Sequence, residues 1–267
     1  MPQTVAVLGA TINQLPFILA AKRRGIRTIS LDNDLSNICH QHSDVQANLS
    51  TADRAGILQY LRTQKIDGVV TCASDVALPT AAYVCEQLHL PTVSSKAVAT
   101  TIHKQAFRSF QDTHRLPSPR SLSFQSTKDA LHSMQKLQGS WVVKPADSSG
   151  SKGISLVNLR HAKNKKGFDR VITQAIEQAL VFSQSGVGII EEFLDGTHCS
   201  VDGFIHDGVL TQLYITNKSI TRPPHLTPIS HTLPSLLSEA VQQSIHAEVL
   251  RVLRLLEVRT GPYDFDL

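Results

Sequence analysis

The first 95 residues alternate between short apolar strands and amphipathic helices, and this alternation constrains the fold more than any other feature. The expected strands are Thr4–Leu8, Arg27–Leu31, Asp44–Ala47, Gly68–Cys72 and Pro91–Val93. The expected helices span residues 13–24, 53–65 and 75–89. Strand, helix and strand within about thirty residues form a right-handed unit with parallel strands. The sequence therefore predicts an α/β fold that begins with a compact open layer over residues 1–95.

Beyond residue 95 the pattern changes to a mixture of helices, strands and turns. A helix is expected over 96–114, and Leu116-Pro-Ser-Pro119 ends it and makes a natural hinge, because proline cannot continue a helix. The strands expected after it are Leu122–Phe124, Val142–Pro145, Ile154–Val157, Gly188–Leu194, Cys199–Ile205, Val209–Thr216 and Gly261–Leu267. Helices are expected at 127–137, 167–184 and 235–257, with a long loop at 219–234.

One stretch in this second part concentrates phosphate-binding chemistry. It reads Val142-Val-Lys-Pro-Ala-Asp-Ser-Ser-Gly-Ser-Lys-Gly-Ile154, which predicts a strand, a small-residue loop and a second strand. A loop of glycines and serines lets backbone N–H groups approach an anion closely, and Lys144 and Lys152 bracket it with positive charge. The structural alternative is a plain hairpin turn.

Composition and cysteine placement exclude several functions. The net charge of +4 suits a small anionic ligand, but the sequence lacks the clustered basic residues with interleaved aromatics that indicate a nucleic-acid partner. Its four cysteines (Cys39, Cys72, Cys85 and Cys199) are scattered, so neither a zinc site nor a disulfide framework is expected. No signal peptide or membrane-spanning stretch is apparent, and we expect a cytoplasmic protein without a membrane partner.

The first βα turn leaves a dinucleotide site open as an alternative. Gly9 stands in the turn and Asp32 at the end of the second strand, where a ribose could be bound. The loop Gly9-Ala-Thr-Ile-Asn-Gln14 lacks the second and third glycines of that fingerprint, so Asp32 fits a strand-end turn residue better. Another ligand at the carboxyl edge of this sheet stays open.

Four motifs then follow in a fixed order: His103-Lys104, Val142-Val-Lys-Pro145, Glu191-Glu-Phe-Leu194, and Asp195-Gly with Ser200-Val-Asp202. This order resembles the ATP-grasp superfamily of carboxylate–amine or carboxylate–thiol ligases, of the biotin carboxylase and carbamoyl-phosphate synthetase type. The resemblance implies a Rossmann-like pre-ATP-grasp domain (1–95) and a linking helix and hinge (96–119). These are followed by an α+β ATP-grasp domain with a lid subdomain (120–196) and a C-terminal subdomain (197–267).

The resemblance also implies ATP and Mg²⁺ as cofactors and gives the lysines and the loop their roles. Lys104 would approach the phosphates from the linking helix, although an exposed helix lysine is the plain alternative. Lys144 would contact the α- and β-phosphates as a catalytic residue. The mobile lid loop over the β- and γ-phosphates would consist of Ser149, Gly150, Ser151, Lys152 and Gly153.

The remaining site residues belong to the adenine hinge and the C-terminal subdomain. The hinge would be Glu191, Glu192, Phe193 and Leu194, with the Glu192 carbonyl on the exocyclic amine and the Leu194 N–H on N1; either glutamate could instead be a rim charge. His198 would bind the ribose, and Lys218 would reach the phosphates or an acyl-phosphate as a catalytic residue. Asp266 would be the first metal-binding carboxylate. Surface or strand-end roles are the alternatives for these three.

The implied function is ATP-dependent joining of a small-molecule carboxylate to an amine, or to another nucleophile, through an acyl-phosphate, by a protein that could form a homodimer. The superfamily continues with a second metal-binding acid, an asparagine and an arginine, whereas this chain stops one residue after Asp266. We therefore expect a fragment with an incomplete C-terminal subdomain. Two alternatives stay open, a non-catalytic nucleotide-binding or interaction protein and an NAD-type dehydrogenase that uses the first domain.

Overall fold

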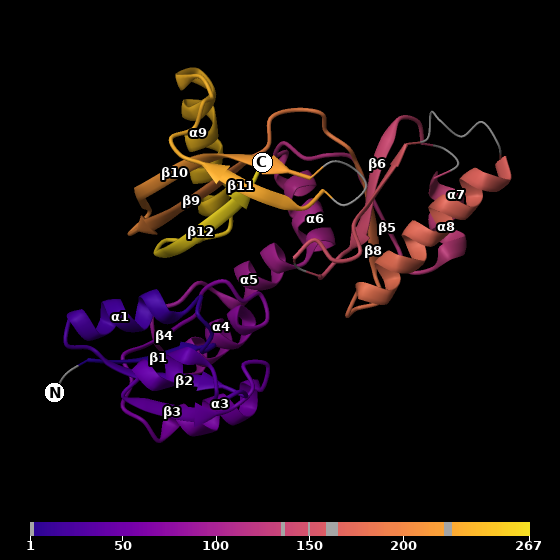
Figure 1. Cartoon of the computed structure of the whole chain (residues 1–267). Helices are drawn as coiled ribbons and strands as arrows, with labels where there is room; N and C mark the ends of the chain where they lie inside the picture. Colours follow the sequence, from indigo (N-terminus) through magenta and orange to yellow (C-terminus); the bar gives the residue numbers. More distant parts are fainter. Residues whose placement is uncertain (1–2, 135–136, 149, 159–164, 222–225) are drawn as a thin grey trace. The chain divides into compact units, whose positions relative to one another are not determined.

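The computed structural model of the chain describes all residues except 1–2, 135–136, 149, 159–164 and 222–225 (Figure 1). The chain divides into two compact units, Met1–Ala99 and Thr100–Leu267. The first contains a parallel sheet and the second contains two antiparallel sheets, so the expected mixed α/β architecture is confirmed. Among the described residues, no helix combines the length and apolar character that crossing a membrane requires.

The first unit is built on a parallel four-stranded sheet in the order β3-β2-β1-β4. Its strands are β1 (Thr4–Leu8), β2 (Arg27–Asp32), β3 (Val45–Asn48) and β4 (Gly68–Val70). Its helices are α1 (Leu15–Arg23), α2 (Ile38–His42), α3 (Arg54–Arg62) and α4 (Ala77–Gln87). The apolar strand residues, such as Leu8 and Ile29, pack with Ile57 of α3 into a closed core. The βαβ pattern of the sequence thus predicted this layer correctly.

Short-range signals set the ends of these helices. Pro16 stands in the first turn of α1, where backbone N–H groups have no partner within the helix, so the N–H that proline lacks is not needed. Gly25 follows the same helix with a φ of +68°, a left-handed conformation that glycine adopts without a Cβ penalty. Asp53 caps α3 by accepting a hydrogen bond from the N–H of Gly56.

Two expectations for this unit were wrong. Pro91–Val93 does not form a strand. Pro91 has no N–H to donate to a neighbouring strand, and its side chain and that of Thr92 are exposed, so neither pairing nor burial favours a strand there. Helix α2 was not expected, because its five residues are too few to show a helical period, although Cys39 within it is fully buried.

The single helix expected at 96–114 is in fact two helices, α5 (Ser95–Ile102) and α6 (Lys104–His114). They are separated by His103, whose φ of −105° and ψ of 108° are extended. The N–H of Lys104 donates to the carbonyl of Ala146 at 2.8 Å instead of bonding within a continuous helix. This long-range bond replaces the helical one, and it places the start of α6 beside the end of a strand.

The second unit begins with an antiparallel sheet in the order β5-β8-β6-β7. Its strands are β5 (Ser121–Phe124), β6 (Ser140–Pro145), β7 (Ser155–Asn158) and β8 (Gly188–Glu192). Helices α7 (Thr127–Met134) and α8 (Lys165–Phe182) pack against it, and Trp141 lies at the centre of the resulting core. Strands β6 and β7 are the arms of the expected strand–loop–strand hairpin, which is confirmed.

A second antiparallel sheet follows in the order β11-β10-β9-β12. It comprises β9 (Cys199–His206), β10 (Val209–Ile220), β11 (Pro228–Thr232) and β12 (Gly261–Asp266), accompanied by α9 (Glu239–Leu255). The expected loop at 219–234 was wrong in part, because β10 extends to Ile220 and β11 pairs with it. All five residues of β11 are exposed. The strand therefore lacks the alternation of apolar and polar residues by which a half-buried strand is recognised in a sequence.

Candidate functional site

Glu191 on β8 is a buried carboxylate with two cationic partners. Its side chain is only 5% exposed, and its Oε2 lies 2.5 Å from the Nζ of Lys144 on the neighbouring strand β6. Its Oε1 accepts a hydrogen bond from the Nε of Arg108 at 2.7 Å, and a second contact joins Arg108 Nη2 to Oε2 at 3.3 Å. The three side chains form a group that we call the lid cluster.

The electrostatics of the lid cluster leave one positive charge in excess. Burial alone would raise the pKa of Glu191, but the charges of Lys144 and Arg108 outweigh burial and hold that pKa below its usual range. Glu191 is therefore ionised at neutral pH and neutralises one of its two partners. A cluster of this kind attracts an anion, because charges in a partly dry environment are weakly screened.

The hairpin loop between β6 and β7 is anchored at its base. Asp147 accepts hydrogen bonds from the hydroxyl of Ser183 and from the N–H groups of Gln184 and Ser185, which follow α8. On the opposite side, the Nζ of Lys104 donates to the carbonyl of Ser148 at 2.7 Å. The Lys104 ammonium therefore lies at the start of the loop. This is the position that it needs if Lys104 and the loop are to bind the same anion.

The loop itself has an unusual backbone. Gly150, Ser151 and Gly153 all have positive φ values, of 69°, 57° and 71°. Such left-handed residues turn consecutive N–H groups toward one side, the geometry of anion-binding loops. Of the other two loop residues named from the sequence, Lys152 has an exposed side chain and Ser149 lies outside the described residues. The loop therefore offers backbone N–H donors and the cation of Lys152 just after β6, the strand that carries Lys144.

The expected hinge residues lie at the end of β8 and just beyond it. Glu191 points into the lid cluster, whereas Glu192 forms an exposed bidentate pair with Arg120, whose guanidinium lies 5.4 Å from the centre of the Trp141 ring. The N–H groups of Glu192 and Phe193 are already bonded to backbone carbonyls. The Leu194 side chain is exposed. The hinge is thus a strand end with one buried and one half-buried carboxylate.

The second polar group lies on one face of the β9–β10–β12 sheet, and we call it the carboxylate face. Lys218 on β10 contacts Asp266 on β12, with Nζ 2.5 Å from Oδ1, and the Ser200 hydroxyl donates to the same oxygen at 3.0 Å. Asp264 lies two residues before Asp266 and directly opposite Asp202 of β9. His198 precedes β9, and its carbonyl accepts the N–H of Lys218 at 2.9 Å.

Crowding of acids perturbs the carboxylate face. Partial shielding from water, together with the charges of Asp202 and Asp266, raises the pKa of Asp264 to about 6. Lys218 opposes this shift with its positive charge. The carboxylate face therefore carries excess negative charge, which a cation would relieve.

The two groups suit ions of opposite sign. The lid cluster and its loop supply cations and N–H donors for an anion. The carboxylate face supplies oxygen ligands, which Mg²⁺ prefers. Within the described ranges, no three His, Cys, Asp or Glu side chains are already arranged to hold a metal. Because Mg²⁺ is commonly bound by one or two carboxylates together with phosphate oxygens, the face fits an ion that arrives with a phosphate ligand.

Several of these residues were missed by the sequence reasoning. Arg108 follows Lys104 by four positions, a spacing that puts both on one side of a helix, but nothing local identifies Glu191 as its partner. Asp264 shares a strand face with Asp266 by simple alternation, and this signal could have found it. The sequence places Asp147 in the loop but gives no sign that its carboxylate anchors the turn after α8.

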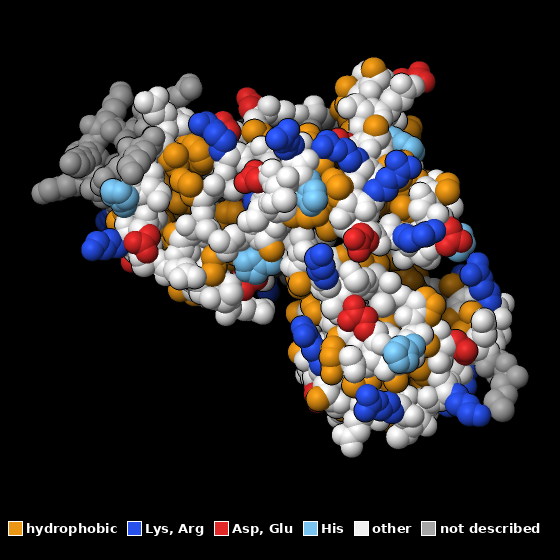
Figure 2. Space-filling model, turned by 180° about the vertical axis from the view of Figure 1, so that it is seen from behind, with side chains coloured by type: hydrophobic (Ala, Val, Ile, Leu, Met, Phe, Trp, Pro, Cys, Tyr) orange, Lys and Arg blue, Asp and Glu red, His pale blue; other side chains and the backbone are white. Residues whose placement is uncertain are grey.

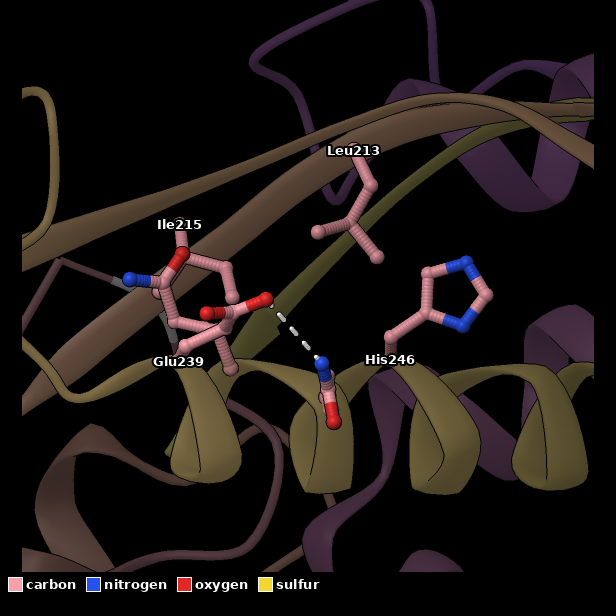
Figure 3. A pocket seen from close by; sticks show the side chains of 6 residues that line it. Leu213, Ile215, Glu239 and His246 are labelled. Atoms are coloured by element: carbon pink, nitrogen blue, oxygen red, sulfur yellow. Dashed lines mark hydrogen bonds between the residues drawn. The ribbon is translucent and has the colours of Figure 1, made fainter.

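A separate hollow of about 450 Å³ lies between α9 and β10 (Figure 3). Leu213 and Ile215 form its apolar side, while Glu239, Gln242, Gln243 and His246 project from α9. None of the described residues that line it is a lysine or an arginine, so these residues do not suit a phosphate ligand. Over the face shown in Figure 2, basic and acidic side chains are interspersed.

Comparison with known proteins gives a family match for part of the chain and a fold for nearly all of it. Residues 137–267 match the family model described as the ATP-grasp domain. A comparison with curated protein sequences gives no match. Among solved structures, the chain is similar to an L-amino acid ligase from Bacillus licheniformis, with 21% identity and a TM-score of 0.78 over 99% of this chain and 63% of that one.

Two further solved structures show the same fold. Phosphoribosylglycinamide synthetase from Anaerococcus prevotii is 17% identical, with a TM-score of 0.74 over 100% of this chain and 64% of that one. The biotin carboxylase domain of 2-oxoglutarate carboxylase from Hydrogenobacter thermophilus, solved with MgADP and bicarbonate, is 15% identical, with a TM-score of 0.79 over 100% of this chain and 61% of that one. The chain spans less than two thirds of the length of each of these three proteins.

Proposed function

We propose, on the premise that residues 137–267 match the ATP-grasp domain, that the chain binds ATP with Mg²⁺ and acts in the ligation of a carboxylate to an amine. The observation that carries the proposal is the lid cluster, in which Glu191 is buried between Lys144 and Arg108 beside a loop of left-handed residues. A triphosphate needs this combination of fixed cations and backbone donors. The MgADP bound to the biotin carboxylase domain supports the same ligand.

Each site residue then has a role in holding the nucleotide. Lys144 would contact the α- and β-phosphates, and Lys104 would reach them from the start of α6. The loop residues 149–153 would cover the β- and γ-phosphates and exclude water from the reacting atoms. The backbone of residues 192–194 would hold the adenine at the strand end, and His198 would hold the ribose.

The carboxylate face would complete the site by binding Mg²⁺ through Asp266, with Asp264 and Asp202 adding negative charge. When bound, the ion would neutralise charge on the phosphate oxygens during transfer. Lys218 now neutralises Asp266, and in the complex it would be free to turn toward the phosphates or the acyl-phosphate. The residues present therefore fit a metal–nucleotide pair better than a metal alone.

The proposed chemistry has two balanced steps. A substrate carboxylate oxygen attacks the γ-phosphorus of ATP, the bond to the β–γ bridging oxygen breaks, and ADP leaves. An amine nitrogen then attacks the acyl-phosphate carbon, inorganic phosphate leaves, and the nitrogen loses a proton to give an amide. The protein contributes positioning and charge neutralisation, which are the main sources of rate in phosphoryl transfer. We also propose that residues 120–196 are the lid subdomain and 197–267 the C-terminal subdomain.

Nucleotide-dependent stabilisation tests the binding step. A ligand at one hundred times its Kd stabilises a folded protein by about 2.7 kcal/mol, so Mg-ATP should raise the melting temperature. Trp141, the single tryptophan of the chain, lies beside the hinge strand and should report the same event by fluorescence. Stabilisation by NADH but not by ATP would overturn the proposal in favour of a dehydrogenase.

A second assay tests ligation itself. The protein is incubated with Mg-ATP and a panel of small carboxylates and amines, and ADP release is measured. Release that depends on both substrates supports the ligase. Tight ATP binding without any substrate-dependent release would instead support a non-catalytic nucleotide-binding protein.

A further inference from the structure

Arg108 is the most tightly held cation of the lid cluster. Its guanidinium donates to both carboxylate oxygens of Glu191, and its Nη1 donates to the Oε1 of Gln111 at 2.5 Å. Gln111 is itself buried, and its Nε2 donates to the carbonyl of Pro117 at 2.7 Å. Three acceptor oxygens therefore fix one guanidinium, which cannot turn away without leaving buried groups unpaired.

The helix that carries Arg108 is fixed at both ends. At its start, the N–H of Lys104 bonds to the carbonyl of Ala146, next to the loop. At its end, Arg251 of α9 donates to the carbonyls of His114 and Arg115 at 3.1 and 3.4 Å. The first of these bonds ties the start of α6 to the end of β6 and the others tie its end to α9, while Lys144 reaches the cluster on a flexible side chain.

The charge balance shows what Arg108 does. With Arg108 present, Glu191 is neutralised and Lys144 contributes a surplus positive charge. Without Arg108, Glu191 and Lys144 would neutralise each other, and the strand would present no net charge to a phosphate. In the intact cluster, burial would raise the pKa of Glu191, but Lys144 and Arg108 together hold it below its usual range, so Glu191 stays ionised and takes up the charge of one of its two partners.

We propose that Arg108 is a positioning residue, which neutralises Glu191 and so leaves the charge of Lys144 available to the phosphates of the nucleotide. Arg108 acts through Glu191 and needs no contact with the nucleotide itself. The inference rests on the proposed function, because it assumes that Lys144 faces phosphates. Gln111 supports Arg108 by fixing the orientation of its guanidinium.

The test uses charge compensation within the full chain. Arg108→Met should weaken Mg-ATP binding by about tenfold or more, because it removes the surplus charge. The double variant Arg108→Met/Glu191→Gln restores the surplus and should return the ATP affinity to within about threefold of the unsubstituted protein. Arg108→Lys keeps the charge but loses the bidentate contact with Glu191, so its ATP affinity should lie between those of Arg108→Met and the unsubstituted protein. Isothermal titration calorimetry gives the dissociation constants.

Adenosine separates a charge effect from a structural one. It carries no phosphate, so its affinity should change by less than about twofold in Arg108→Met. Lys128→Met is the matched control, because it removes one positive charge from the exposed side of α7, and it should leave the ATP affinity within about twofold. If Arg108→Met does not fold, the single Glu191→Gln variant should still bind ATP about tenfold more tightly than the double variant.

The outcomes are distinguishable. If the unsubstituted protein does not bind Mg-ATP, both the proposed function and this inference fail. If it binds ATP and Arg108→Met binds equally well, the inference alone is overturned. Equal losses for ATP and adenosine, or no recovery in the double variant, would show that Arg108 only maintains the fold.

Discussion

Replacing Asp147 by alanine should loosen the base of the lid loop. Asp147 Oδ1 accepts from the Ser183 hydroxyl at 2.8 Å and from the Gln184 N–H at 3.0 Å, and Oδ2 accepts from the Ser185 N–H at 2.6 Å. These bonds connect the end of β6 with the turn after α8. In the Asp147→Ala variant, all three donors lose their acceptor.

The magnitude follows from the number and exposure of these bonds. A hydrogen bond to a charged group contributes about 1.5–3 kcal/mol when buried. Gln184 and Ser185 are exposed, so water can replace part of what is lost, and the three bonds share one carboxylate. We therefore expect a loss of about 2 kcal/mol in the free energy of unfolding, rather than the sum of three full contributions.

Urea unfolding followed by the fluorescence of Trp141 measures this loss in the relevant part of the chain, because Trp141 lies on the same strand as the loop base. The pH dependence gives an independent check. Burial would raise the pKa of Asp147, but its hydrogen bonds outweigh burial and lower it. Its contribution is therefore fully present above the unfolded pKa of about 4 and is lost as the pH falls through the lower folded pKa.

The difference between the unsubstituted protein and Asp147→Ala should thus be constant from pH 6 to 8 and shrink below about pH 4. Ser126→Ala is a control for the loss of side-chain hydrogen bonds away from the loop. The Ser126 hydroxyl donates to Asp129 and accepts the Asp129 N–H at the start of α7, so its loss should cost about 1 kcal/mol without affecting the loop. A loss below about 0.5 kcal/mol, which is the range of ordinary surface substitutions, would refute the idea that Asp147 anchors the loop.

Three further outcomes are expected. Gly153→Ala should destabilise the hairpin by about 2 kcal/mol or more, because its φ is +71° and a Cβ would lie 3.0 Å from both Phe182 and Pro145. Gly150→Ala should cost only about 1 kcal/mol, since a Cβ there meets nothing within 4 Å. Urea unfolding compares the free energies of unfolding of the two variants. The raised pKa of Asp264 means that the folded protein loses stability as the pH rises from about 4 to 6. Asp264→Asn should therefore stabilise the protein above pH 6 by up to about 1 kcal/mol, after allowing for solvent screening, and should have no effect near pH 4. Lys218→Met should raise the pKa of Asp264 above about 6, since it removes the opposing positive charge, and NMR titration of the carboxyl carbon measures this directly.

The elements predicted correctly from the sequence are those with a strong period or a local end signal. The strands and longer helices of the first unit are of this kind, because alternation and caps are encoded within each segment. The failures are segments whose structure depends on distant atoms. The break at His103 depends on the carbonyl of Ala146, which bonds the N–H of Lys104, and β11 depends on pairing with β10 rather than on burial.

The site residues also divide into those that are neighbours in the chain and those that depend on distant partners. The loop and Lys144 could be proposed as an ion-binding group from the sequence, because their donors and cations are neighbours in the chain. The pairing of Arg108 with Glu191 spans 83 positions, and 26 basic and 22 acidic residues offer too many alternatives for one sequence to select it. A single sequence therefore identifies which residues can bind an ion but not which of them neutralise one another.

In the carboxylate face, the register of strand pairing determines which acidic residues lie next to one another. Burial raises the pKa of Asp264 to about 6, and the charge of Asp202 adds to the shift, because β12 pairs with β9 so that the two acids lie directly opposite each other. A shift by one residue would turn the side chains of β12 to the other face of the sheet, and Tyr263, now buried, would be exposed. The burial of apolar residues on one face thus fixes the register that brings the acids together on the other. The tendency of this face to take up a cation is therefore a consequence of the hydrophobic core behind it.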